Sequence, residues 1–356
     1  MKFRSQPKLI RIASLCALSL AAINSCAPVV QAQTAPEPQT QLRAFDPQPA
    51  PAGILRIWGD TYMSSVVLAW EDHFRRYHPE VRFENRLMGT DTAMPGLYTG
   101  KADIALLGRE SNTTDNDGFL HTLQYRPLQL HLMTGSLDIS GKSYAPVVFV
   151  HKDNPIDSLT LQQLDAVLGC GQTGQPVSAR TWGDLGLTGA WKDKPLQVYT
   201  FDAETGTGLF LLHKLNGESR KMNWPIIHEY RDIRRPDGST YDSGQQIIDA
   251  LGGDPSGLAV SGMQYEDDRV KPLPLAATRN QPSVQATRQS LIDRSYPLAR
   301  MTYAFVNQPP DQPVPPLVKE FLRFAYSEEG QRLIEPSSGF LPLARQDADA
   351  QILLLH

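Results

Sequence analysis

Residues 196–210 read LQVYTFDAETGTGLF, and this stretch carries the strongest signal for the fold. Residues 196–200 are typical of a strand, residues 202–208 form a polar turn with two glycines, and residues 206–215 have helical spacing. A strand, a turn and a helix in this order leave the first backbone N–H groups of the helix free at the carboxyl end of the strand. A small anion is stabilised there, because the helix dipole is positive at its N-terminus.

Two other turns have the same design. Residues 59–64, GDTYMS, follow an apolar run at 54–58. Residues 89–93, GTDTA, follow a strand pattern at 81–87. Ser, Thr and Asp are also ordinary helix caps, so one such turn alone is more often a cap than a ligand site. The three turns predict an anion site only if they converge in one cleft.

Strand and helix patterns alternate along the rest of the chain. Short apolar runs typical of buried strands occur at 102–107, 146–150, 257–260 and 301–306. Helical patterns occur at 64–77, 161–168, 245–251, 317–326 and 328–334. This alternation predicts an α/β fold with mostly parallel sheets. With 356 residues, 41% of them hydrophobic, the chain is long enough for two domains.

The first 32 residues have the order of features of a secretory signal peptide. A basic start precedes an apolar stretch at 12–23, and VQA at 30–32 offers a small-residue cleavage site. The alternative is a lipoprotein cut before Cys26, although Asn24 is unusual in such a signal. Residues 33–52 are rich in Pro, Gln and Ala and predict a flexible leader. We therefore expect export to the periplasm.

The formal net charge of −4 gives no electrostatic footprint for nucleic acid. Residues 1–32 hold four basic and no acidic residues, so their removal leaves a net charge of −8. An anion site in such a chain must attract its ligand locally. The same removal leaves Cys170 as the only cysteine, so no internal disulfide is expected.

The sequence lacks the common signatures of hydrolytic enzymes. It contains neither a Gly-x-Ser-x-Gly elbow nor a His-Glu-x-x-His pair, since His228-Glu229 has no second histidine at the required spacing. We therefore expect no catalytic residue, no metal site and no cofactor. An exported hydrolase is the rival class of function.

Several short motifs occur in an order and spacing that match a known family. They are GKADIAL at 100–106, VVFVHKDNP at 147–155, SLTLQQL at 158–164, TWGDL at 181–185, YPLAR at 296–300, SEEGQ at 327–331 and GFLPL at 339–343. Together they resemble the periplasmic phosphate-binding proteins of phosphate ABC transporters, within the type II solute-binding superfamily. The match runs from about residue 54 to residue 343.

The resemblance implies a two-lobed α/β fold with a ligand cleft between the lobes. Lobe 1 would be discontinuous, made from residues 53–145 and 303–356, and lobe 2 would span residues 146–302. Crossing segments near 144–150 and 299–306 would join them. The family closes on its ligand like a hinged clam, so binding is expected to shift an open–closed population.

The resemblance also assigns ligand roles, through threonine hydroxyls and the backbone N–H groups of the turns. The candidate ligand residues are Thr61, Tyr62, Thr90, Asp91, Thr92, Arg109, Thr205, Gly206 and Thr207. The family often has an arginine where this chain has Phe201, and its second loop is richer in glycine. Asp91 either accepts a proton from a partly protonated phosphate or caps a helix. Arg109 either supplies the missing positive charge or forms a surface ion pair.

These features predict a solute-binding protein that captures phosphate or a related small oxyanion without covalent chemistry. Its expected partner is an inner-membrane ABC permease, and we expect a monomer. A ligand-binding sensor or an adhesion module is an alternative, because the same kind of site serves those functions.

Overall fold

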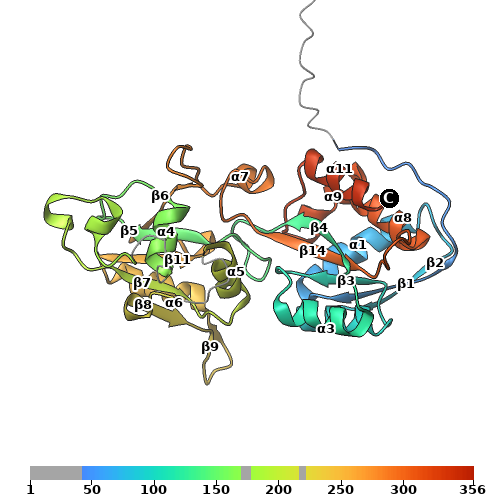
Figure 1. The fold of residues 1–356 in the computed structure, drawn as a ribbon, viewed down its shortest axis with the longest axis horizontal. Coiled ribbons are helices and arrows are strands. Elements are labelled where there is room, and N and C mark those ends of the chain that lie inside the picture. The colour runs from blue at the N-terminus through green and yellow to red at the C-terminus, as the bar shows by residue number, and fades with distance from the viewer. Residues whose placement is uncertain (1–41, 170–177, 216–221) are drawn as a thin grey trace, which may run out of the picture. The chain divides into compact units, whose positions relative to one another are not determined.

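The computed structural model describes residues 42–169, 178–215 and 222–356 (Figure 1). The predicted signal peptide at 1–32, with Cys26, and also Cys170 lie outside the described residues. Within the described ranges, no helix is both long enough and apolar enough to cross a membrane.

The first sheet has five strands in the order β2-β1-β3-β14-β4. They are β1 (Gly53–Gly59), β2 (Val81–Arg86), β3 (Ile104–Leu107), β4 (Leu128–Thr134) and β14 (Met301–Val306). β1 pairs in parallel with β2 and β3, whereas β14 pairs antiparallel with β3 and β4. The chain leaves this sheet along β4 and re-enters it along β14, so these neighbouring strands run in opposite directions.

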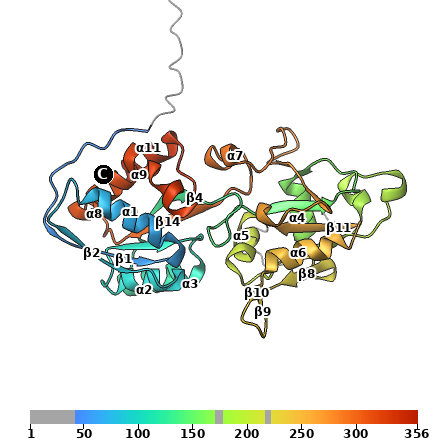
Figure 2. The same cartoon turned by 180° about the vertical axis from the view of Figure 1, so that it is seen from behind.

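Helices cover both faces of the first sheet (Figures 1 and 2). Helices α2 (Ala93–Tyr98) and α3 (Thr113–Leu123) lie on one face. The opposite face carries α1 (Ser64–Phe74), α8 (Pro316–Ala325), α9 (Glu328–Arg332) and α11 (Arg345–Leu354), and α10 (Ile334–Ser338) packs on α1. The buried rings of Trp70 and Phe74 on α1 meet Phe321 of α8 edge to face, which fixes α1 against α8.

The second sheet has five strands in the order β12-β5-β11-β7-β8. They are β5 (Val147–His151), β7 (Gln197–Phe201), β8 (Ile227–Tyr230), β11 (Gly257–Ser261) and β12 (Val270–Pro272). Its helices are α4 (Leu161–Leu168), α5 (Gly206–Leu215), α6 (Ser243–Gly252) and α7 (Arg288–Ile292). Two short pairs complete the strands, β6 (Leu159–Thr160) with β13 (Leu275–Ala276) and β9 (Ile233–Arg234) with β10 (Thr240–Tyr241).

Each sheet has its own hydrophobic core. The first core draws on residues 55–133 and 301–355, and the second on residues 145–298 together with Leu341. The predicted α/β class is confirmed, but the expectation of mostly parallel sheets is wrong, because each sheet is mixed. In the second sheet, β5 pairs antiparallel with both β11 and β12.

The described part of the leader, residues 42–52, packs on the first core. The ring of Phe45 meets Tyr77 and Phe324 edge to face, with centroid distances of 5.1 and 5.2 Å. The backbone N–H of Gln48 donates to the Glu320 carboxylate at 2.7 Å. An aromatic side chain in a Pro-rich stretch thus anchors the segment.

Replacement of Phe45 by Ala is expected to lower the free energy of unfolding by about 2 kcal/mol, because a partly buried ring is lost from the first core. Urea unfolding followed by circular dichroism measures the change. Leu353→Ala is the matched control, since Leu353 is 72% exposed. Equal, small losses in both variants would contradict an anchoring role for Phe45.

Candidate anion-binding site

A pocket of about 800 Å³ receives residues from all three predicted turns. Seven of the nine candidate ligand residues line it: Tyr62, Thr90, Asp91, Arg109, Thr205, Gly206 and Thr207. Thr61 and Thr92 are not among its lining residues. The Thr92 hydroxyl instead donates to the carbonyl oxygen of Gly89 at 2.8 Å, so it closes its own turn.

The turn before α5 holds free backbone donors. The Thr205 hydroxyl donates to the carbonyl oxygen of Asp202 at 2.7 Å and accepts the N–H of Gly208 at 3.1 Å, so this side chain shapes the turn. Gly208 lies so close to Asp202 that a Cβ would overlap the carbonyl oxygen. Within the described residues, the N–H groups of Gly206 and Thr207 have no acceptor. They are free donors at a helix N-terminus.

Asp60 lines the pocket just after β1, and sequence reasoning missed it. Its carboxylate accepts the backbone N–H of Tyr62 at 2.8 Å, so this expected ligand donor is already bonded. Gly108 faces the carboxylate with no room for a Cβ. Burial raises the pKa of Asp60, although its bonds to the Tyr62 N–H and the Thr90 hydroxyl act in the opposite direction. The site therefore contains a carboxylate whose charged form is disfavoured by burial and favoured by its hydrogen bonds.

Arg109 lines the pocket, but its guanidinium is already paired. Nη1 lies 2.6 Å from the Asp115 carboxylate, and Nη2 lies 3.1 Å from the Asp91 carboxylate. Asp115 also closes the capping box of α3 with Asn112. The Asp91 side chain is 94% exposed. The geometry matches the ion-pair interpretation of Arg109, so an anion needs a positive charge from elsewhere.

Arg300 provides that charge. It lines the pocket, is only 4% exposed, and forms no ion pair with a carboxylate in the part of the chain that the structure describes. Its Nη1 donates to the Thr207 hydroxyl at 3.3 Å, and its Nη2 lies 3.5 Å from the Gly206 carbonyl oxygen. Its Nε has no partner among the described residues. Burial lowers the pKa of Arg300, which reflects the cost of an unpaired cation.

Sequence reasoning singled out the segment that contains Arg300 but not the role of its side chain. Arg300 ends the YPLAR motif, which contributed to the resemblance without a role for the side chain. Phe201, where the family often has an arginine, is buried and also lines the pocket. The signal that was available is an arginine directly before a mostly apolar strand pattern, where a solvated charge is unusual.

The segment between β4 and β5 fixes the first turn. Nζ of Lys142 donates to the carbonyl oxygen of Tyr62 at 2.7 Å, and the Ser143 hydroxyl donates to the carbonyl oxygen of Gly108. Gly141 lies so close to the Tyr62 ring that a Cβ would overlap it. A connection between the two sheets thus helps to build the pocket wall.

A family model described as the PBP superfamily domain matches residues 44–329. The chain belongs to the PBP superfamily. The match covers every strand of both sheets, and the predicted α/β fold of the periplasmic-binding-protein kind is confirmed. Membership in the PBP superfamily also agrees with a pocket formed by turns that follow strands of both sheets.

The curated relatives of this PBP-superfamily chain include two Pseudomonas aeruginosa proteins, each named phosphate-binding protein PstS. Each is 29% identical over 304 residues, which cover 85% of this chain and 86% of the relative. The crystal structure of PstS from Borrelia burgdorferi is similar in fold, with a TM-score of 0.54 and 15% identity over 82% of this chain and 98% of that chain.

Replacement of Arg300 by Met is expected to keep or raise the stability of the ligand-free protein, by as much as about 3 kcal/mol, because it removes an unpaired buried charge. Urea unfolding in a buffer free of oxyanions measures the effect. Arg109→Met is the control and is expected to destabilise, since it breaks the ion pair with the buried Asp115. A loss of more than about 2 kcal/mol in Arg300→Met would assign Arg300 a structural role instead.

Proposed function

We propose that this protein is an exported solute-binding protein that captures phosphate and delivers it to an ABC permease. The proposal rests on the guanidinium of Arg300, which among the described residues is buried without a carboxylate partner, beside two N–H groups of α5 that have no acceptor there. A buried cation of this kind lowers the stability of the fold until an anion compensates it. The names of the Pseudomonas aeruginosa relatives support phosphate as that anion.

In the proposed complex, the oxyanion lies at the N-terminus of α5. The N–H groups of Gly206 and Thr207 donate to its oxygens, and Arg300 supplies charge-assisted hydrogen bonds. The Thr207 hydroxyl accepts from Arg300 at 3.3 Å, so its own proton is free for the ligand. Thr61, Thr90, Thr92 and the N–H of Tyr62 donate no hydrogen bond to the ligand in this arrangement, because the Thr90 hydroxyl and the Tyr62 N–H are already bonded to the Asp60 carboxylate.

Asp60 takes the role that the sequence suggested for Asp91. The Asp60 carboxylate is buried in the pocket, whereas the Asp91 side chain is exposed and paired with Arg109. A carboxylate beside the anion accepts a hydrogen bond from a protonated phosphate oxygen. Sulfate carries no proton at neutral pH and would be repelled. Asp60 therefore favours phosphate over sulfate.

The remaining parts of the proposal follow from the sequence and the family. Residues 1–32 act as the signal peptide, and the mature protein works in the periplasm as a monomer with an inner-membrane permease as its partner. Binding is non-covalent, and the protein has no catalytic activity.

Phosphate is expected to stabilise the protein in a thermal unfolding assay. At about 100 times its dissociation constant, it adds roughly 2.7 kcal/mol to the free energy of unfolding. Arg300→Met removes this shift, because the main compensating charge is lost. Thr92→Ala is the control and keeps the shift, since the Thr92 hydroxyl bonds within its own turn. A shift with sulfate or molybdate but none with phosphate would overturn the choice of anion.

Asp60→Asn is expected to change selectivity. Asn keeps an acceptor for the Tyr62 N–H but removes the charge that repels sulfate, so the preference for phosphate over sulfate falls by about tenfold or more. Calorimetric titration with each anion at one pH of about 7.5, which lies well above the usual carboxyl range, gives the ratio of the two affinities. Asp91→Asn is the matched control. An unchanged ratio in Asp60→Asn would exclude Asp60 from selectivity.

A further inference from the structure

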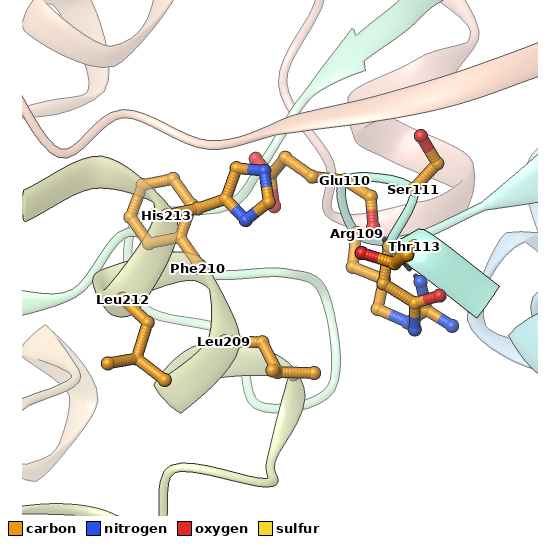
Figure 3. Close-up of a pocket in the computed structure, with 10 residues that line it drawn as sticks. Arg109, Glu110, Ser111, Thr113, Leu209, Phe210, Leu212 and His213 are labelled. Carbon is orange, nitrogen blue, oxygen red and sulfur yellow. Dashed lines mark hydrogen bonds between the residues drawn. The ribbon is translucent and has the colours of Figure 1, made fainter. Parts of the chain in front are cut away.

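Glu110 lies beside the proposed anion site without being one of its lining residues. It lines a smaller pocket of about 100 Å³ between the segment after β3 and helix α5 (Figure 3). That pocket shares Arg109 and Gly206 with the 800 Å³ pocket, so the two are adjacent. A charge on Glu110 is therefore close to the turn that faces the anion.

The Glu110 side chain reaches toward α5. Figure 3 shows it extending from its loop to the side of the helix that carries Phe210 and His213. The Tyr303 hydroxyl lies 3.4 Å from its Oε1, which is a long hydrogen bond. In the described part of the chain, Glu110 forms no ion pair with a basic side chain. Its charge is thus not neutralised by a direct contact.

Arg300 also lies next to Phe210. The guanidinium carbon of Arg300 stands 5.1 Å from the centre of the Phe210 ring, and Phe210 lines the same small pocket as Glu110. Tyr303, which contacts Glu110, follows Arg300 by three residues on the same segment. Burial lowers the pKa of Arg300, and Glu110 is the strongest of the charges that act against this shift. Glu110 is therefore the main resident carboxylate that compensates Arg300 from a distance.

Other acidic groups near the site have different partners or act less on Arg300. Asp91 and Asp115 pair with Arg109 at 3.1 and 2.6 Å, and Asp60 is bonded to the Tyr62 N–H at 2.8 Å. Glu204, Asp232 and Asp242 also line the 800 Å³ pocket, but Glu110 is the carboxylate that acts most strongly on Arg300, and it forms no ion pair among the described residues.

We propose that Glu110 is an affinity-setting residue, whose negative charge partly neutralises Arg300 and competes with the bound oxyanion. This inference rests on the proposed function, because it takes the pocket to be an anion site. Glu110 makes no contact with the ligand. Its charge lowers the affinity for the anion electrostatically, because charges interact more strongly in a partly buried site than in water. A binding protein that must hand over its ligand gains a faster release from such a charge.

The test measures oxyanion affinity by calorimetric titration of the mature protein. Wild type is first titrated with phosphate, sulfate and molybdate, and the variants are then titrated with whichever anion binds most tightly. Glu110→Gln is expected to bind that anion about five- to tenfold more tightly, because the competing charge is removed while the side-chain shape is kept. Glu110→Asp keeps the charge and is expected to stay within about twofold of wild type.

Glu84→Gln is the matched control. Glu84 is exposed on β2 and lines none of the pockets described above, so the same change in net charge is expected to leave affinity unchanged. A gain of affinity is not a result that a folding defect produces. Equal or weaker binding by Glu110→Gln overturns the inference but leaves the proposed function intact. A preference for another oxyanion overturns only the choice of phosphate, and no binding of any anion to wild type overturns both.

Discussion

The anion site depends on one constraint, which is that a guanidinium is buried where the chain passes from the second sheet to the first. Arg300 directly precedes β14, whose six residues are all buried, and its own side chain is buried with the pocket beside it. Its carbonyl oxygen accepts the N–H of Gly135 at 2.9 Å, on the other connection between the sheets. Both connections therefore hold the cation in place. The unfavourable free energy of burying it is offset when an anion binds.

The same connections shape the turns around the cation. Lys142 and Ser143 donate to backbone carbonyl oxygens in the turns that follow β1 and β3. The Ser140 hydroxyl lies 2.9 Å from the hydroxyl of Tyr265, which follows β11 of the second sheet. The pocket is thus built from strand ends and from the segments that join the sheets. A change in the connections would alter the donors and the cation together. This coupling gives a physical route by which ligand binding affects the arrangement of the chain.

The sequence predicted the parts of the site that depend on the succession of residues within one short stretch. The turn before α5 follows from a strand, hydroxyl residues and glycines in sequence, and the structure places Gly206 and Thr207 as free donors there. Local order did not separate Thr92, which bonds within its turn, from Thr90, which faces the pocket. Both are threonines in one short turn, and packing gives their hydroxyls different acceptors, the Gly89 carbonyl oxygen for Thr92 and the Asp60 carboxylate for Thr90. Helix α3 was missed because its exposed, polar sequence lacks an apolar stripe, and a capping box starts it instead.

The roles of Arg300, Asp60 and Glu110 depend on contacts between segments that are distant in the sequence, so no short sequence motif predicts these roles. Asp60 and Glu110 are both carboxylates near an anion, which is unfavourable in a chain of net negative charge. Their environments separate their effects. Asp60 is buried in the pocket, where its carboxylate accepts a hydrogen bond from a protonated anion and repels an anion without a proton. Glu110 lines a pocket together with Phe210, which also contacts Arg300, and it acts on the ligand through Arg300. Selectivity and affinity are thus set by different carboxylates around a single cation.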